Sequence, residues 1–198
     1  MKQSMKHLLQ DGKCHILPGV YDAMIAKICE KIGFKALVMG GYGVAASLLG
    51  EPDVGYLSMT EMATRLGQIC DAVDIPVLAD GDTGYGNALS VQRTVREFEK
   101  AGAAAMFLED QEWPKRCGHM AGKRVIPMEE HVQKIRAAVD ARQNPEFLIM
   151  ARTDARAVNG LDDAIERSLA YKEAGADIIF VEAPQSLDEL KEVSTRIK

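Results

Sequence analysis

The sequence predicts an α/β domain built on a parallel sheet, and three observations support this class. Short apolar runs alternate with amphipathic segments along the chain, as expected for buried strands joined by helices. Related segments recur, because the runs that begin at Gly33, Gly102 and Gly175 each lead from a helix-ending glycine into a strand. Two further runs, 74–82 and 144–154, share a proline followed by a strand. With the first apolar run, 15–19, these segments make six strand–helix units.

The expected strands are short runs of about five residues, continuous in apolar character and flanked by Pro, Gly or Asp. This pattern is typical of strands that are buried on both faces of a sheet. In chain order they are HILPG (15–19), ALVMG (36–40), PVLAD (76–80), AMFLE (105–109), FLIMA (147–151) and DIIFV (177–181).

Helical patterns fill the intervals between these runs. The segment 129–142 places Val132, Ile135 and Val139 on one stripe, with charged residues opposite. The segment 161–175 has two aspartates in its first turn and a glycine at its end, which suits the helix dipole and a C-cap. Two capping boxes indicate further helix starts, Ser58-x-x-Glu61 and Ser186-x-x-Glu189.

Uniform alternation of this kind fits either a closed barrel or an open, doubly wound sheet. A dinucleotide-binding sheet of the second type carries G-x-G-x-x-G after its first strand. Here the glycines follow the second strand in a different pattern, MGGYG. We therefore favour a (β/α)8 TIM-type barrel with about six βα units present. Because such a barrel needs eight units and about 250 residues, we expect residues 1–198 to be a single barrel domain truncated at the C-terminus.

Composition narrows the function classes. The chain is 47% apolar and 27% charged, which is ordinary for a globular protein. A net charge of -5 argues against a nucleic-acid partner, and no apolar run is long enough to span a membrane. The N-terminus lacks a signal-peptide pattern, and the four cysteines are widely spaced without C-x-x-C. We expect a cytoplasmic protein with reduced thiols.

Charged residues gather where the predicted strands end, which is where barrel enzymes carry their chemistry. The strand ends read Gly40-Gly41-Tyr42, Asp80-Gly81-Asp82, Glu109-Asp110, Arg152-Thr153-Asp154 and Glu182. Clustered buried carboxylates are costly unless they are paired or bind a metal, and Mg²⁺ favours such oxygen ligands. The alternative is that Asp80 and Asp82 only serve the turn in DGDTGYG.

Cys117 lies in a loop, residues 111–127, that is long for a connection between a strand and a helix. Its neighbours Lys115, Arg116 and His119 would favour a thiolate and keep it accessible. The alternative is that Cys117 is a small buried hydrophobic residue. Composition alone leaves both readings open.

Six segments resemble the isocitrate lyase and phosphoenolpyruvate mutase superfamily in order and spacing. They are GVAASLLGEPDVG, LADGDTGYGN, FLEDQ, KRCGHMAGK, IMARTDA and FVEAP. The resemblance covers the chain from about Gly19 to Pro184, and it is strongest to the 2-methylisocitrate lyase and 2,3-dimethylmalate lyase branches. The C-G-H of the loop favours a lyase over a phosphonate-forming mutase.

The resemblance implies a Mg²⁺ site, with Mn²⁺ as the alternative metal. Asp80 would contact the metal directly or through water, and Asp53, Asp82 and Glu109 would hold its water shell. The metal would chelate the 2-hydroxyl and carboxylate of a small carboxylic-acid substrate.

The resemblance also implies substrate-binding and catalytic roles. The implied substrate-binding residues are Gly40, Gly41, Tyr42, Gly118, His119 and Arg152. Cys117 would protonate the carbanion of the departing acid, and Glu182 would lie near the bond that breaks. The family further implies a homo-oligomer, a tetramer in the complete protein.

Three departures leave the substrate open. Gly40 stands where methylisocitrate lyases often have serine, Tyr42 is bulkier than the glycine common there and should narrow the site, and MAGK follows C-G-H. The implied reaction is Mg²⁺-dependent carbon–carbon cleavage of a 2-hydroxy di- or tricarboxylate to pyruvate and a second carboxylic acid. The alternatives are hydrolysis of oxaloacetate, a carboxyphosphonoenolpyruvate phosphonomutase-like reaction, or a non-catalytic barrel.

Overall fold

The structure is a computed structural model that describes residues 4–197. Strands and helices alternate along it as the sequence predicts. The elements are α1 (Met5–Gln10), β1 (Gly19–Val20), α2 (Ala23–Ile32), β2 (Leu37–Met39), α3 (Gly41–Leu49), α4 (Met59–Ala72), β3 (Val77–Asp80), α5 (Ala88–Lys100), β4 (Ala105–Glu109), α6 (Met128–Ala141), β5 (Leu148–Thr153), α7 (Ala155–Val158), α8 (Leu161–Glu173), β6 (Ile178–Val181) and α9 (Leu187–Arg196).

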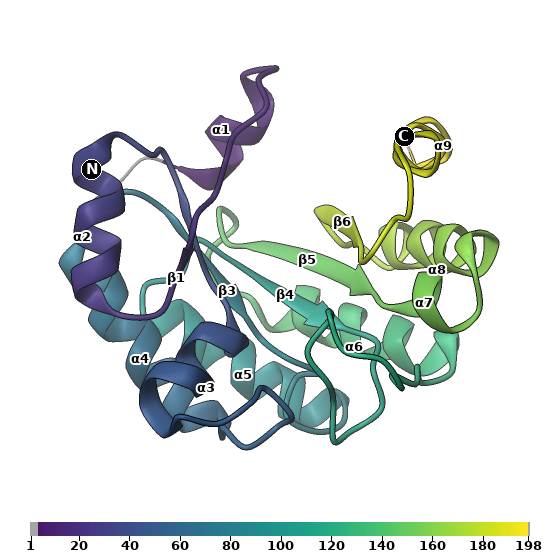
Figure 1. Ribbon diagram of the computed structural model, residues 1–198, viewed down its shortest axis with the longest axis horizontal. Helices are drawn as coiled ribbons and strands as arrows, with labels where there is room; N and C mark the ends of the chain where they lie inside the picture. The colour runs from purple at the N-terminus through teal and green to yellow at the C-terminus, as the bar shows by residue number, and fades with distance from the viewer. Residues whose placement is uncertain (1–3, 198) are drawn as a thin grey trace.

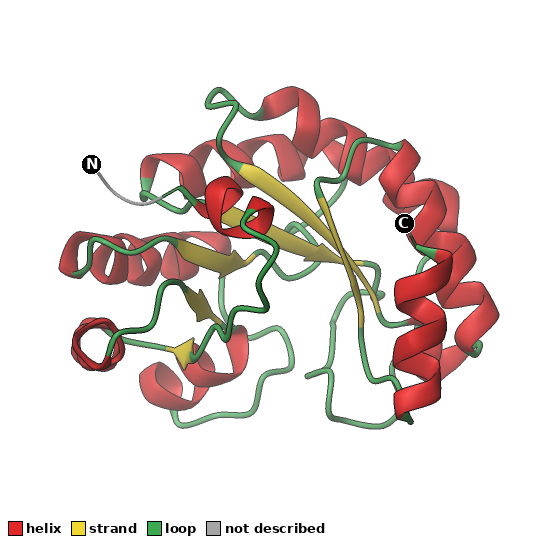
Figure 2. Ribbon diagram, turned by 90° about the horizontal axis from the view of Figure 1, so that it is seen from above, coloured by secondary structure: helices red, strands yellow, loops and turns green. Residues whose placement is uncertain are grey.

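The six strands form one sheet in the order β1-β2-β3-β4-β5-β6, and every neighbouring pair is parallel. A doubly wound sheet reverses its strand order at a switch point, and this sheet does not. The strands lie in the middle with the helices around them (Figures 1 and 2). The parallel α/β prediction with six βα units is confirmed, and the arrangement is an arc of a TIM-type barrel.

The first expected strand is misplaced. The sequence predicts a strand over 15–19, but β1 comprises only Gly19 and Val20. Pro18 has no N–H to give to a ladder, although its carbonyl accepts from Val38 N at 3.1 Å. The other five strands lie within about two residues of the expected runs.

Both predicted helix starts are confirmed. Ser58 and Glu61 form a complete capping box at the start of α4. The Ser186 side chain accepts from Glu189 N at the start of α9. No helix within residues 4–197 is both long and apolar enough to cross a membrane.

The two faces of the sheet bury different clusters. One face packs on the surrounding helices through residues such as Met39, Ala79, Leu108 and Ile149. The side chains of the opposite face are Val38, Leu78, Phe107, Met150 and Ile178, and they pack with Met5 and Leu8 of α1. Because strand side chains alternate between faces, the residues two positions further along these strands also face α1's side of the sheet.

Candidate active site

Charged residues occupy the carboxyl ends of the strands, on the same face of the sheet as this second cluster. Asp80 lies two residues after Leu78, Glu109 two after Phe107 and Arg152 two after Met150. The register pairs Glu109 with Arg152 and Arg152 with Phe180, which places Glu182 on the same side. The predicted convergence of strand-end acids with an arginine is therefore present.

One group of charges surrounds Lys115. Its ammonium lies 2.6 Å from Asp53 Oδ1 and 2.7 Å from Asp82 Oδ1. Asp80 accepts from Gly41 N at 2.8 Å and from Asp82 N at 2.9 Å. All three carboxylates and the lysine are buried. The predicted Asp53, Asp80 and Asp82 are thus brought together around a lysine.

Burial controls the ionisation of this group. Desolvation, helped by the nearby Asp80 charge, raises the pKa of Asp82 to about 6, although Lys115 opposes the rise. Burial lowers the pKa of Lys115, but the Asp82 and Asp80 carboxylates outweigh it and raise that pKa. The lysine therefore stays an ammonium ion and acts as the internal counterion of the aspartates.

A second group surrounds Arg152. Its guanidinium donates to both carboxylate oxygens of Asp154, at 3.0 and 3.1 Å. It also lies 3.5 Å from Glu109 Oε2 and 3.4 Å from Glu182 Oε2. The guanidinium carbon stands 5.9 and 5.4 Å from the ring centroids of Phe107 and Phe180. Asp154 and the two phenylalanine rings therefore hold the guanidinium in place, and its charge faces the two glutamates.

Glu109 is the least satisfied acid of the site. Its Oε1 is buried and has no hydrogen-bond partner in the described part of the chain. Burial raises its pKa well above the usual range, although the Arg152 charge opposes the rise. A buried carboxylate oxygen without a partner is costly, and a cation would relieve that cost.

The loop that carries Cys117 folds back over both groups. Gln111 pairs with Val125 in an isolated antiparallel bridge, and the Gln111 amide bonds both N and O of Arg116. Cys117 N donates to Asp53 O at 3.0 Å. The thiol is half-buried and the His119 side chain is exposed.

Gly118 of this loop lies against Arg152 and Glu182. A Cβ built there would collide with Arg152 Nη2 and lie 2.9 Å from the Glu182 carboxyl group. Lys115, which the sequence suggested as a cation beside the thiol, is instead used by the aspartates. The structure thus brings Gly118 close to Arg152 and Glu182.

The predicted Gly40-Gly41-Tyr42 segment forms the start of α3. Gly40 is the N-cap residue, and the amide of Gly41 donates to Asp80 rather than standing free. The Tyr42 side chain is 66% exposed. The ring thus lies largely in solvent, and the narrowing of the site by Tyr42 stays a prediction.

The partners of the two loop lysines and the residues that support Arg152 were not predicted from the sequence. Lys123 Nζ donates to Asp154 Oδ1 at 2.8 Å and to Gly118 O at 2.7 Å. Asp110, one residue after Glu109, accepts from Asp154 N at 2.9 Å. The sequence does hold a signal for the lysines, because an excess of acids at strand ends requires counterions. Lys115 and Lys123, which flank C-G-H, are the lysines of this loop.

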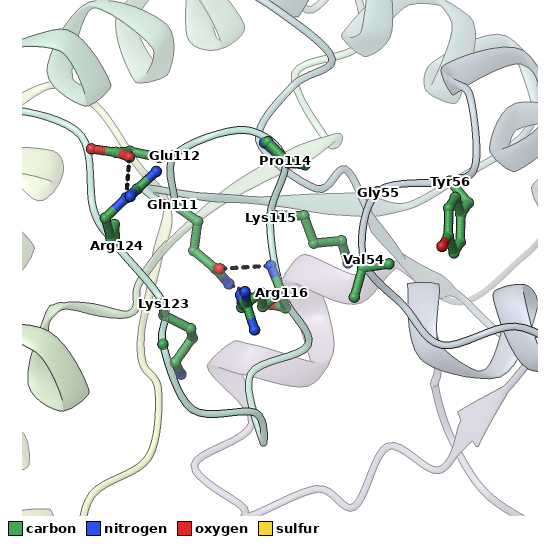
Figure 3. A pocket seen from close by; sticks show the side chains of 11 residues that line it. Val54, Gly55, Tyr56, Gln111, Glu112, Pro114, Lys115, Arg116, Lys123 and Arg124 are labelled. Carbon is green, nitrogen blue, oxygen red and sulfur yellow. Dashed lines mark hydrogen bonds and ion pairs between the residues drawn. The ribbon is translucent and has the colours of Figure 1, made fainter.

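A cavity of about 590 Å³ lies between this loop and residues 54–56 (Figure 3). The loop contributes four cationic residues to its wall, namely Lys115, Arg116, Lys123 and Arg124. Glu112 pairs with Arg124 at 2.6 Å, and Arg116 forms no ion pair within the described residues. Because Lys115 and Lys123 pair with aspartates of the site, Arg116 is the cation of this wall that is left to attract an anion.

The residues fit a divalent cation by their chemistry. In the described part of the chain, no three His, Cys, Asp or Glu side chains are arranged around one point as a metal site. Lys115 instead lies between two of the expected ligands. The unpaired Glu109 oxygen and the raised pKa of Asp82 nevertheless mark a carboxylate set of the type that Mg²⁺ prefers.

Comparison with known proteins gives strong matches. A family model described as phosphoenolpyruvate phosphomutase matches residues 5–198. The chain is 56% identical to 2,3-dimethylmalate lyase of Eubacterium barkeri, over 98% of this chain and 67% of that protein. It is 52% identical to carboxyvinyl-carboxyphosphonate phosphorylmutase of Arabidopsis thaliana, over 96% and 58%. It is 47% identical to 2-methylisocitrate lyase of Aeropyrum pernix, over 98% and 62%. The chain thus spans 58 to 67% of the length of these relatives.

Solved structures agree. Oxaloacetate acetylhydrolase in complex with 3,3-difluorooxalacetate superposes with a TM-score of 0.94 at 36% identity, covering 98% of this chain and 67% of that one. 2,3-Dimethylmalate lyase, described as a PEP mutase/isocitrate lyase superfamily member, gives 0.92 at 37%, covering 96% and 65%. Phosphonopyruvate hydrolase in complex with oxalate and Mg²⁺ gives 0.87 at 34%, covering 96% and 66%.

Proposed function

We propose that this chain, which belongs to the phosphoenolpyruvate phosphomutase family of the isocitrate lyase superfamily, is a Mg²⁺-dependent carbon–carbon lyase. Its substrate is a 2-hydroxy di- or tricarboxylate of the 2,3-dimethylmalate or 2-methylisocitrate type. Retro-aldol cleavage yields pyruvate and a second carboxylic acid.

The charge balance of the buried site is the observation that carries this proposal. The buried acids are Asp53, Asp80, Asp82, Glu109, Asp154 and Glu182, and the buried cations are Lys115, Lys123 and Arg152. Acids outnumber cations two to one, so a substrate with several carboxylates would be repelled. A divalent cation removes most of that repulsion and gives the substrate oxygens a partner.

In the reaction, the proposed ligands Asp53, Asp80, Asp82 and Glu109 would hold the metal. When bound, Mg²⁺ supplies electrophilic stabilisation of the negative charge that develops on the substrate oxygens. Mn²⁺ would serve the same role, since it also favours oxygen ligands.

The protein residues divide the remaining work. Arg152 pairs with the carboxylate that becomes part of pyruvate, in the forked geometry of a guanidinium. Glu182 faces both Arg152 and Gly118 and accepts the proton of the 2-hydroxyl, directly or through a water. The carbon–carbon bond then breaks, its electron pair passes to the departing acid, and the Cys117 thiol protonates that carbon. The Gly118 and His119 amides bind the carboxylate of the departing acid.

A coupled pyruvate assay tests the proposal. Branched malates and citrates are supplied with and without Mg²⁺, and we expect pyruvate only when the metal is present. Oxaloacetate and carboxyphosphonoenolpyruvate belong in the same panel, because the chain is similar to oxaloacetate acetylhydrolase and to carboxyvinyl-carboxyphosphonate phosphorylmutase. Turnover of either, without cleavage of any hydroxy acid, would replace the lyase assignment.

Two substitutions separate the roles. Cys117→Ser should reduce turnover by about 10²–10⁴-fold, because a serine hydroxyl is too weak an acid. Retention of more than about a tenth of the wild-type rate would remove the proton-donor role. Asp80→Ala should weaken Mg²⁺ binding in calorimetry, and an unchanged affinity would reject Asp80 as a ligand.

A further inference from the structure

The ion pair between Lys123 and Asp154 lies outside the groups that the proposed reaction uses. We propose that Lys123 is a positioning residue, a latch that holds the loop segment Cys117–Gly118–His119 against Arg152 and Glu182. Its catalytic consequence rests on the proposed function, whereas the latch itself is a property of the chain.

Lys123 joins two parts of the molecule that are far apart in sequence. Its ammonium donates to Asp154 Oδ1 at 2.8 Å, just after β5, and to Gly118 O at 2.7 Å, in its own loop. Lys123 is 8% exposed and Asp154 is fully buried. Hydrogen bonds of a buried ammonium ion to such partners are among the strong ones. One side chain thus ties the loop backbone to the strand end that carries Arg152.

The anchor of this latch is rigid. The carboxylate of Asp154 also holds Arg152 through two hydrogen bonds, and its backbone N donates to Asp110 Oδ1 at 2.9 Å. Asp110 is itself buried and accepts through Oδ2 from Thr153 Oγ1 and Tyr171 OH, each at 2.8 Å. Lys123 therefore ties the loop to a carboxylate, that of Asp154, whose own position is fixed.

The latched segment fits the site closely. Gly118 leaves no room for a Cβ beside Arg152 Nη2 and Glu182. A shift of the loop by about 1 Å would change the distance of Cys117 from any reacting carbon, and such displacements are costly to catalysis. The position of the loop and the position of the guanidinium are therefore set by the same aspartate.

The rest of the loop tip has few other ties. His119, Met120 and Ala121 are exposed. Arg124, the next cation along, pairs with Glu112 of the same loop at the surface, so it does not join the loop to the barrel. This difference makes Arg124 a matched control for Lys123.

Hydrogen exchange resolved by peptide mass spectrometry tests the latch in the purified protein. The reporters are the amides of Cys117 and Met120, which donate to Asp53 O and Cys117 O. Lys123→Met should accelerate their exchange at least about tenfold, because it removes two hydrogen bonds that a charged ammonium donates, to Gly118 O and to Asp154 Oδ1. Arg124→Met should leave it within about twofold of wild type, and Lys123→Arg should restore most of the protection.

Protection of the β4 and β5 amides shows in the same experiment that the variant is folded. If Lys123→Met loses that protection, Lys123→Gln replaces it as the test variant, with the same expected acceleration at the tip. Equal exchange at the tip in the folded variant and wild type overturns the latch.

The lyase assay gives the second readout. Lys123→Met should lower kcat by about tenfold or more, with a smaller effect on KM, because proton delivery depends on the position of Cys117. A folded variant with accelerated exchange but unchanged kcat overturns the positioning role. Accelerated exchange in a protein whose wild type cleaves no hydroxy acid supports the latch and rejects only the proposed function.

Discussion

Replacing Gly118 with alanine should impair catalysis while leaving the fold intact. The added methyl group would collide with Arg152 Nη2 and would lie 2.9 Å from the Cδ and Oε1 atoms of Glu182. Arg152 cannot yield cheaply, because it donates twice to Asp154 and stands over the rings of Phe107 and Phe180. The loop must therefore move away from the site.

The size of the effect follows from the distance that the loop must move. Carbon contacts are favourable at about 3.5–4.0 Å, so relieving the overlap requires a displacement of about 1 Å. A misplacement of that size can cost about 10²-fold in rate. The free energy of unfolding should fall by up to about 3 kcal/mol, because movement of the loop weakens the hydrogen bond from the Lys123 ammonium to Gly118 O.

The pyruvate assay and urea unfolding together test this reasoning, with Gly67→Ala as the matched control. Gly67 lies inside α4, and a Cβ built there meets no atom within 4 Å. That substitution should stabilise the protein by about 0.5–1 kcal/mol and leave the rate unchanged. A Gly118→Ala enzyme within about twofold of the wild-type rate would refute the proposed closeness of Gly118 and Arg152.

Three further predictions follow from buried charges. Asp110→Ala should lower the free energy of unfolding in urea by about 3–5 kcal/mol, because the buried Arg167 loses one of its two carboxylate partners and the buried donors Thr153 Oγ1, Tyr171 OH and Asp154 N lose their acceptor. Tyr171→Phe should cost only about 1 kcal/mol. Burial, aided by nearby cations, lowers the pKa of His131 from 6.5 to about 3, so the folded state holds it neutral. The contribution of His131 to the free energy of unfolding should be fully present above about pH 6.5 and should fall by up to about 1.4 kcal/mol per pH unit toward pH 3. Urea titrations should show that the free energy of unfolding of His131→Phe depends less on pH over this range. Lys115→Met should tighten Mg²⁺ binding by about tenfold or more in calorimetry, because it removes a cation from two of the proposed ligands, and weaker binding would contradict that placement.

The fold could be predicted wherever local sequence and burial agree. The five strands after β1 are continuous apolar runs, and a strand buried on both faces leaves little choice of position. The helix α1 was missed because it has six residues and no side-chain cap, so its local signal is weak. Its stability comes from burying Met5 and Leu8 against the sheet, and that contact is visible only once the strands are placed.

The acids of the site could be predicted because the parallel topology fixes where strand ends lie. Glu109 and Arg152 are register partners on neighbouring strands, and Asp80 ends β3 opposite Phe107, on the same face of the sheet. The lysines could not be placed in the same way. A lysine has four rotatable methylenes and its ammonium can reach several acids, so sequence spacing does not select its partner. Lys115 was expected to act on Cys117 but pairs with the aspartates, because two buried carboxylates need a counterion more than a half-buried thiol does. The excess of negative charge at the strand ends thus determines the partners of the loop lysines, and through them the path of the loop that presents Cys117.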